Sequence, residues 1–241
     1  MLDPGIPLGI LGGTFDPVHL AHLALARAAL DRLGLAQVRW IPAGQPPHRA
    51  TPLSAPEHRL AMVSAAIADE MRFTLDAGEV ASAAPSYTVH TLERLRRELG
   101  ESRPLVLLMG ADAFRGLHTW HRWEEVFSLA HIAVATRPGF PLQDFAPPLT
   151  EKFAQCRLPG RGDPAQCRLP DGGDPSQCRL ASADFSQAPA GGIYPFELVV
   201  GTVSATEVRA LIAAGAPDER LLALLSAPVL DYIRQHKLYR C

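Results

Sequence analysis

The sequence predicts an α/β protein built on a parallel sheet with crossover helices. Short apolar segments typical of buried strands alternate along the chain with longer segments of helical periodicity. Residues that cap or start helices stand between them. The chain has 241 residues, 47% of them hydrophobic and 20% charged, which is enough for one full core. We therefore expect residues 1–241 to form a single domain.

Six strands are expected, and each is an apolar run bounded by turn or capping residues. They cover residues 8–11, 37–41, 72–75, 105–109, 132–136 and 198–200. The first ends in two glycines, and residues 19–33 then carry leucines at helical spacing, on a common side.

Four further helices are expected from their end signals. Ser54 and Ser204 each stand three positions before a glutamate, which predicts capping boxes for helices ending near residues 69 and 213. Ser86 is expected to cap a helix ending near residue 100. Pro228 stands at the start of a last helix, which should end near residue 238. The C-terminal part of the chain is therefore expected to be helical.

Charge and hydropathy argue against two classes of partner. The formal net charge of −2 offers no basic excess for nucleic acid. No stretch approaches the roughly 18 apolar residues of a membrane span, and residues 1–11 lack the basic region of a signal peptide. We expect a cytoplasmic protein with no nucleic-acid or membrane partner. The four cysteines lack the spacing of a zinc or redox site and are interpreted as free thiols.

A tandem repeat interrupts the alternation of strands and helices. Gln-Cys-Arg-Leu recurs every eleven residues, at Gln155, Gln166 and Gln177. Proline and glycine in the first two units exclude a continuous helix. We interpret residues 154–190 as a flexible surface insertion. Metal binding by the regularly spaced cysteines is the alternative.

Residues 12–22 (GGTFDPVHLAH) follow the first strand and should form the turn into the first helix. Gly12 and Gly13 would let the backbone turn sharply and approach a ligand closely. Asp16 is a natural N-cap and Pro17 suits the first helical position, so the helix should begin there.

His19 and His22 lie three positions apart, which predicts two imidazoles on one face of the helix. The N-terminus of a helix favours an anion, so these donors predict a phosphate site. A metal pair is the alternative, although no carboxylate or third histidine stands at suitable local spacing. Strand–glycine–helix turns are also common in α/β proteins without any such site.

A second helix start of this kind lies far along the chain, at residues 203–209 (VSATEVR). Ser204 and Thr206 would present hydroxyl groups at its positive end, with Arg209 one turn further on. A plain capping box with an exposed arginine is the alternative.

Together the two segments resemble the nucleotidylyltransferase superfamily, which combines Gly-Thr-Phe-Asp-Pro-x-His-x-x-His with a late Ser-x-Thr-x-x-Arg helix start. Ala21 and Val203 replace the usual glycine and isoleucine. Within the superfamily the chain is most similar to the nicotinate-mononucleotide adenylyltransferases. Further similar segments follow in order over nearly the whole chain: residues 41–42, 46–49, 85–88, 110–112, Trp120, 137–139, 228–233 and 238–240. The repeat is the main departure, and without two of its units the connection would have the usual family length.

The resemblance implies a Rossmann-like sheet that binds ATP between the two motifs. The implied reaction is attack by the 5′-phosphate of nicotinate mononucleotide on the α-phosphorus of ATP, which gives the deamido dinucleotide and pyrophosphate. A phosphate monoester is already a nucleophile at neutral pH, so neither a general base nor a nucleophilic side chain is needed. Mg²⁺ should accompany ATP, held by phosphate oxygens and water, with no metal site made by the protein alone.

The resemblance also implies roles for individual residues. The residues expected at the reacting phosphates are His19, His22, His48 and Arg209. The residues expected to bind ATP are Gly12, Gly13, Thr14, Phe15, Gly110, Asp112, Arg137, Ser204 and Thr206. Thr88 and Trp120 should receive the nicotinate group, Trp120 by stacking on its ring. His121 stands where the family often has an aromatic residue.

Other functions remain open on the sequence alone. A sister enzyme would use nicotinamide mononucleotide or phosphopantetheine, although the phosphopantetheine enzymes are shorter and lack the segments around His48 and Thr88. A silent nucleotide-binding regulator could have the same fold. Trp120, taken alone, could be an ordinary core or surface aromatic.

Overall fold

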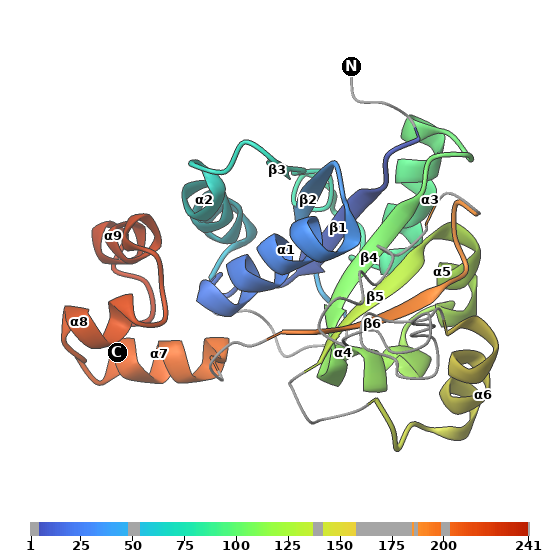
Figure 1. Ribbon diagram of the computed structural model, residues 1–241. Helices are drawn as coiled ribbons and strands as arrows, with labels where there is room; N and C mark the ends of the chain where they lie inside the picture. Colours follow the sequence, from blue (N-terminus) through green and yellow to red (C-terminus); the bar gives the residue numbers. More distant parts are fainter. Residues whose placement is uncertain are drawn as a thin grey trace, which may run out of the picture.

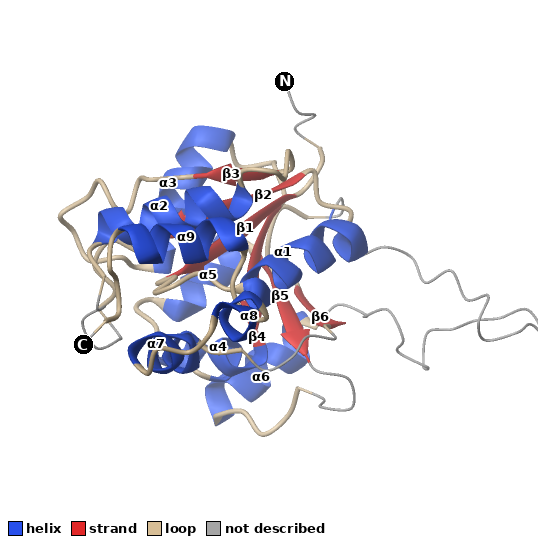
Figure 2. Ribbon diagram, turned by 90° about the vertical axis from the view of Figure 1, so that its left-hand side faces the viewer, coloured by secondary structure: helices blue, strands red, loops and turns tan. Residues whose placement is uncertain are grey.

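One six-stranded parallel sheet forms the centre of the protein, as Figures 1 and 2 show for the computed structural model. The structure describes residues 5–47, 54–136, 142–157, 185, 188–198 and 203–240. The strands are β1 (Leu8–Gly13), β2 (Gln37–Pro42), β3 (Phe73–Leu75), β4 (Leu105–Gly110), β5 (His131–Thr136) and β6 (Ile193–Glu197). Their order is β3-β2-β1-β4-β5-β6, and all neighbours run parallel. The predicted Rossmann-like α/β class is confirmed.

Helices cover both faces of the sheet. They are α1 (Leu20–Leu33), α2 (Pro56–Ile67), α3 (Thr88–Leu99), α4 (Ala111–Arg115), α5 (Trp123–Leu129), α6 (Pro147–Cys156), α7 (Ala205–Ala213), α8 (Asp218–Leu222) and α9 (Ala227–Gln235), with a 3₁₀ turn at Leu117–Thr119. In Figure 1, α1 and α2 lie on one side of the sheet and α3 and α5 on the other. The C-terminal helices α7 to α9, in orange and red, gather beside α1 and α2.

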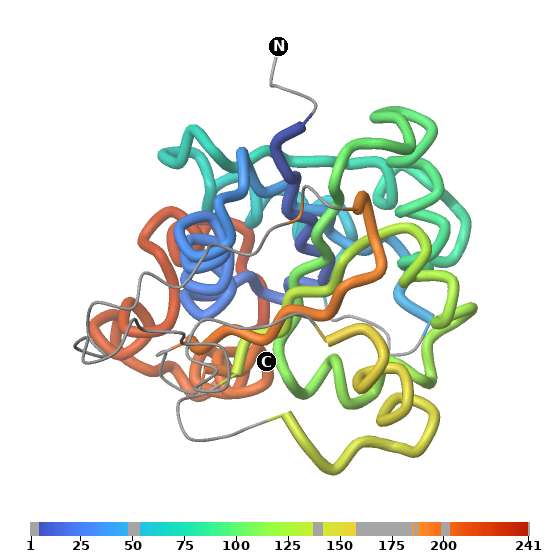
Figure 3. The backbone as a smooth tube through the Cα atoms, turned by 45° about the vertical axis from the view of Figure 1, so that its right-hand side comes forward, coloured from blue at the N-terminus to red at the C-terminus, as the bar shows by residue number. Residues whose placement is uncertain are grey.

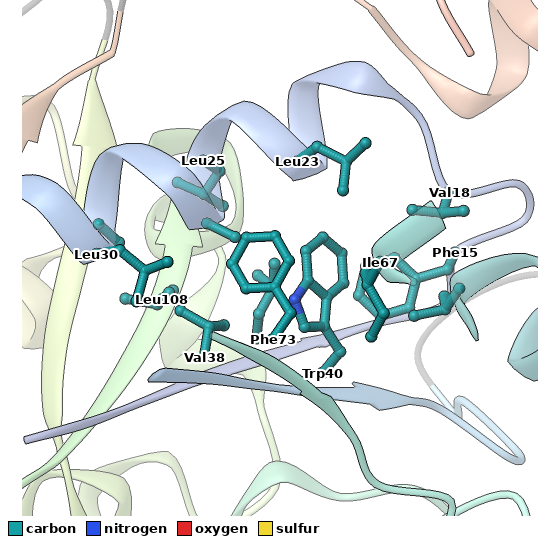
Figure 4. Packing of buried hydrophobic residues seen from close by; sticks show 14 of the residues in the cluster. Phe15, Val18, Leu23, Leu25, Leu30, Val38, Trp40, Ile67, Phe73 and Leu108 are labelled. Carbon is teal, nitrogen blue, oxygen red and sulfur yellow. The ribbon is translucent and has the colours of Figure 1, made fainter. Parts of the chain in front are cut away.

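The strands bury both faces, because successive side chains of a strand point to opposite sides. In β1, Leu8 and Ile10 join the cluster under α3 to α6, whereas Leu11 joins the cluster under α1 and α2. Figure 4 shows the cluster under α1 and α2, in which the ring centroids of Trp40 and Phe73 lie 5.4 Å apart. The apolar runs of the sequence are therefore strands covered on both faces.

The strand order places a crevice at the middle of the sheet. β1 lies between β2 and β4, and the chain leaves β1 toward one face and β4 toward the other. In doubly wound sheets, ligands bind outside the carboxyl ends of the strands at this reversal of strand order. In Figure 3, blue β1 and green β4 run side by side through the centre of the molecule.

Five predicted strands are confirmed, and the sixth is wrong. It was expected at residues 198–200, but the strand at this edge is β6, Ile193–Glu197; Leu198 follows it outside the strand, and residues 199–200 lie outside the described part of the chain. Pro195 lies inside this strand and made the segment unlike a strand in sequence. A proline is tolerated there because β6 is an edge strand, whose contact beyond β5 among the described residues is a single bridge from Arg157 to Ile193, so Pro195 needs no N–H group on that side.

Asp16 is not the N-cap of the first helix. His19 holds that position, and Pro17 precedes the helix rather than opening it. The Asp16 carboxylate accepts a hydrogen bond of 2.7 Å from the hydroxyl of Tyr239 near the end of the chain. A tertiary partner has replaced the local capping interaction that the sequence suggested.

Two of the three predicted serine caps are also wrong. Ala55 is the N-cap of α2 in place of Ser54. Tyr87 is the N-cap of α3, because the Ser86 hydroxyl accepts hydrogen bonds from another loop. The prediction for Ser204 is confirmed, since its Oγ accepts a 3.1 Å bond from the N–H of Glu207.

Most of the predicted insertion lies outside the described residues, including Cys167 and Cys178. Its two described ends differ from a flexible loop. Residues 154–156 complete α6, where Cys156 is a free thiol. Phe185 is only 2% exposed, and its ring lies 5.0 Å from that of His131. Part of the insertion therefore belongs to the core.

Candidate active site

A cleft with a volume of about 1330 Å³ opens at the carboxyl ends of β1 and β4. Every predicted site residue that the structure describes lines this cleft: Gly12, Gly13, Thr14, Phe15, His19, His22, Thr88, Gly110, Asp112, Trp120, Ser204, Thr206 and Arg209. The predicted residues His48 and Arg137 lie outside the described part of the chain. Their neighbours Pro47 and Thr136 line the cleft.

The turn after β1 has a different backbone from the one the glycines suggested. Gly12 and Gly13 are the last residues of the strand, and the left-handed conformation falls on Phe15, with φ +50°. A bulky residue in that region is strained and is held there by its surroundings. The Phe15 ring is buried beside Trp40, at 5.5 Å between centroids. A Cβ on Gly13 would lie 3.0 Å from the Phe15 ring, so a larger residue here would require that ring to shift.

His19 and His22 stand together at the start of α1, as the spacing predicted. Their rings are stacked with centroids 3.8 Å apart. The backbone N–H of His19 donates to Nδ1 of His22 at 3.2 Å. Because Nδ1 accepts, the proton of a neutral His22 ring resides on Nε2. His22 thereby offers Nε2–H as its donor at the cleft.

Burial separates the electrostatics of the two histidines. His19 is 7% exposed, and this burial lowers its pKa from 6.5 to about 4. Its imidazole is therefore neutral at neutral pH. The sequence predicted two donor imidazoles on one face of the helix, and the structure has a buried neutral ring stacked on a half-exposed one.

The second helix start meets the first through Arg209. Its Nη1 donates a 2.7 Å hydrogen bond to the backbone carbonyl of Asp16, and its Nη2 lies 3.4 Å from Oγ1 of Thr206. Ser204 caps the same helix. Two segments far apart in sequence thus form adjoining walls of one cleft, with hydroxyl, guanidinium and helix N–H donors directed at a shared space.

Asp16 also receives the C-terminal segment. Its side chain is 5% exposed and accepts from the Tyr239 hydroxyl. Burial, together with the nearby Asp16 carboxylate, raises the pKa of Tyr239 well above its ordinary value. Tyr239 therefore remains a donor throughout the physiological range and ties the end of the chain to the turn after β1.

The opposite wall carries the predicted acceptor residues. Thr88 is the first residue of α3, and Trp120 is half-buried against the cluster under α3 to α6. Tyr87 and His121 also line the cleft, with ring centroids 4.3 Å apart. Asp112 is exposed and accepts a 3.0 Å bond from Arg115.

Arg59 lies behind the lining of the cleft, and the sequence prediction missed it. It is fully buried in α2 and donates to backbone carbonyls beside the cleft, among them that of Thr14 at 2.8 Å. The signal was present, because Arg59 stands three and four positions before Met62 and Val63 on the apolar face of a predicted helix. An arginine there requires buried acceptors.

Glu79 is a second missed residue of the cleft. Burial raises the pKa of its carboxyl group, although a hydrogen bond from Thr91 and another from Ser86 act in the opposite direction. Its position in an irregular segment before α3 gave no sequence signal.

The model of the cytidylyltransferase-like family matches residues 10–210. The chain therefore belongs to the cytidylyltransferase-like family and, within it, to the nicotinate-nucleotide adenylyltransferases. A probable nicotinate-nucleotide adenylyltransferase of Dechloromonas aromatica is 49% identical over 97% of this chain and 98% of its own. One of Stenotrophomonas maltophilia is 46% identical, over 95% of each chain.

Solved structures agree in fold. A Plasmodium falciparum nicotinic acid mononucleotide adenylyltransferase complexed with NaAD has a TM-score of 0.66 at 13% identity, over 97% of each chain. A putative nicotinate-nucleotide adenylyltransferase from Vibrio parahaemolyticus has a TM-score of 0.57 at 14% identity, over 98% of this chain and 96% of that one. At these identities the likeness concerns the fold.

Among the described residues, no helix is both long and apolar enough to cross a membrane. In the same residues, no three histidine, cysteine, aspartate or glutamate side chains come together as a metal site.

Proposed function

We propose that this protein transfers the adenylyl group of ATP to nicotinate mononucleotide, giving the deamido dinucleotide and pyrophosphate in NAD biosynthesis. One observation carries the proposal. The helix starts at His19 and at Ser204 face one cleft and are joined by the bond from Arg209 to Asp16. The names of the full-length relatives support the acceptor.

The chemistry needs position and charge stabilisation rather than a side-chain nucleophile. The phosphate monoester of the acceptor attacks the α-phosphorus of ATP in line, and the bond to the bridging oxygen of pyrophosphate breaks. Nε2–H of His22 donates to the α-phosphate as its negative charge develops. Neutral His19 fixes the position of this ring by stacking, so its own role differs from that of His22.

We assign binding of the pyrophosphate part of ATP to the second helix start, at the beginning of α7. Ser204 accepts the capping bond through Oγ, so its O–H group can donate to a phosphate oxygen. Arg209 and Thr206 add a charged and a neutral donor there. Gly12 leaves open space beside the strand, since a Cβ there would meet no atom within 4 Å. We assign this space to the phosphates and Asp112 to a ribose hydroxyl.

We assign the acceptor to the wall formed by Thr88 and Trp120. The indole offers a flat face suited to a pyridinium ring. His121, beside Tyr87, stands at the rim of this wall. His48 and Arg137 retain their predicted roles at the reacting phosphates and ATP.

Mg²⁺ is proposed to accompany ATP. Among the described residues, the carboxylates of the cleft that could coordinate a metal ion do not stand together. Asp16 already accepts a hydrogen bond from Tyr239, and Asp112 accepts one from Arg115. Such a donor set suits an ion carried by phosphate oxygens and water. The ion would neutralise phosphate charge. A cytoplasmic location and the lack of a nucleic-acid partner also remain predictions.

The test is pyrophosphate release from ATP and Mg²⁺ with nicotinate mononucleotide or nicotinamide mononucleotide as acceptor. Strong preference for the acid is expected. Preference for the amide would retain the reaction and change the acceptor. No pyrophosphate release with either acceptor, while ATP still binds, would contradict the proposal and favour a nucleotide-binding regulator without catalytic activity.

A further inference from the structure

The buried guanidinium of Arg59 connects two loops at the carboxyl end of the sheet. None of the residue is exposed to solvent. Nη1 donates to the carbonyl of Thr14 at 2.8 Å and also to that of Ala43. Nη2 donates to the carbonyl of Gly44 at 2.9 Å, and Nε to that of Ser54 at 3.2 Å.

Two of these acceptors, Thr14 and Ala43, line the cleft in the loops that follow the neighbouring strands β1 and β2. Thr14 is in the turn after β1, where the phosphates are assigned. Ala43 and Gly44 follow β2 and lead to Pro46 and Pro47, which line the cleft. Hydrogen bonds from a charged donor are roughly twice as strong as neutral ones, and the planar fork fixes their relative directions. The N–H of Ala43 also donates to the carbonyl of Gly13 at 2.9 Å, and Arg59 adds a charged brace that fixes the loops beyond this bond.

The loop at residues 43–47 is held from its other side by Ser86. Oγ of Ser86 accepts from the N–H groups of Gly44 at 2.9 Å and Gln45 at 3.1 Å. The loop is also pressed against the chain at Glu79, where a Cβ on Gly44 would come within 2.1 Å of the Glu79 carbonyl oxygen. Ser86 stands two positions before Thr88 on the acceptor wall.

We propose that Arg59, with Ser86, is a positioning device that holds the phosphate turn at a fixed distance from the acceptor wall. The inference rests on the adenylyl transfer proposed above. Neither side chain is required to touch a reacting atom. Their effect is on the alignment of the two substrates, which react in line and need their reacting atoms about 3–3.5 Å apart.

The chain offers a matched control in Arg96. This arginine is also buried, at 3% exposure, and also donates to backbone carbonyls, including that of Leu129 from Nε at 2.8 Å. Its other acceptors include the carbonyls of Arg103 and Pro189. These residues precede β4, β5 and β6, so Arg96 braces the amino end of the sheet, away from the lining of the cleft.

The experiment compares R59K and R96K, two substitutions that retain charge but lose the fork. The measurements are Tm, the dissociation constant of ATP without acceptor, and kcat and KM with nicotinate mononucleotide. Both variants should lower Tm. R59K should lower kcat by about 10- to 100-fold, as misalignment near 1 Å does, with ATP affinity changed less than about threefold. R96K should retain kcat per folded molecule.

Equal kcat in R59K and the unmodified enzyme would overturn the proposal, as would equal losses in R59K and R96K. If R59K does not fold, S86A carries the test, since it releases the same loop from the other side. A fall in kcat of about tenfold with ATP affinity retained is expected, and an unchanged kcat would refute the inference. Turnover by the unmodified enzyme tests the proposed reaction separately.

Discussion

Nη1 of Arg209 donates a hydrogen bond of 2.7 Å to the backbone carbonyl oxygen of Asp16, a residue 193 positions earlier in the chain. The bond joins the N-terminal ends of α1 and α7. An arginine can hold a carbonyl with one nitrogen and meet a phosphate with another, because its donors are fixed in a plane.

The substitution Arg209→Lys should therefore lower kcat/KM by about 100-fold, as loss of one transition-state donor does. A single ammonium group cannot occupy both positions. Pyrophosphate release measures the effect. Arg220→Lys, on the exposed surface of α8, is the matched control and should behave as the unmodified enzyme. Activity of R209K within twofold of the control would show that Arg209 only braces the turn.

His22 should be replaceable in part by glutamine but not by asparagine or alanine. The amide nitrogen of glutamine can approach the position of Nε2, which is the donor when Nδ1 accepts from His19. We expect His22→Ala to lower kcat by at least about two orders of magnitude, and His22→Gln to retain more activity than His22→Asn. His236→Ala, an exposed residue after α9, is the control. Full activity of His22→Ala would contradict the mechanism.

Burial of His19 predicts a loss of stability in mild acid. Its folded-state pKa of about 4 lies below the unfolded value of 6.5, so the unfolded chain binds more protons between these pH values. The free energy of unfolding should fall as pH drops from 6.5 toward 4, with about 3 kcal/mol attributable to His19. Urea unfolding at several pH values measures this.

His19→Gln should remove that part of the pH dependence. His131 is also buried with a lowered pKa, caused by burial, and it contributes in the same direction. Urea unfolding of His131→Gln and of the double variant over the same pH range separates the contributions of the two histidines to the pH dependence. An identical pH slope in the unmodified enzyme and His19→Gln would mean that His19 does not titrate on unfolding.

Phe185→Ala should destabilise the fold, although the residue lies within the repeat region. Its side chain packs on His131 and on Tyr194, and the ring centroids of Phe185 and Tyr194 are 6.0 Å apart. Removal of a buried phenylalanine costs about 3–5 kcal/mol. Denaturant unfolding measures the loss, and Phe145→Ala, on a half-buried ring near α6, should cost less. Unchanged stability of Phe185→Ala would mean that the segment contributes nothing to the core and is a surface insertion. Deletion of residues 165–186 would then leave the fold intact.

Strong periodic segments were predictable from the sequence, whereas tertiary partners were not. Strands β1 to β5 are continuous apolar runs because both of their faces are covered. Strand β6 was missed because Pro195 is acceptable only at an edge, which one sequence does not reveal. The helices α4 and α8 have five residues each, too few to show a period.

The same distinction applies to the cleft. The residues of both helix-start motifs were found because helix starts have a local pattern. Asp16, Ser54 and Ser86 were assigned as caps on that local pattern, but Asp16 binds Tyr239 and Ser86 binds the loop after β2. Those partners become visible only when the chain is folded.

Transfer of label from ATP tests the central proposal most directly. The enzyme is incubated with nicotinate mononucleotide and with ATP labelled at either the α- or the γ-phosphorus. We predict that the α-label appears in the dinucleotide and the γ-label in pyrophosphate, because attack at the α-phosphorus separates them. Transfer of the γ-label to the acceptor, or no transfer of either label, would contradict adenylyl transfer by this cleft.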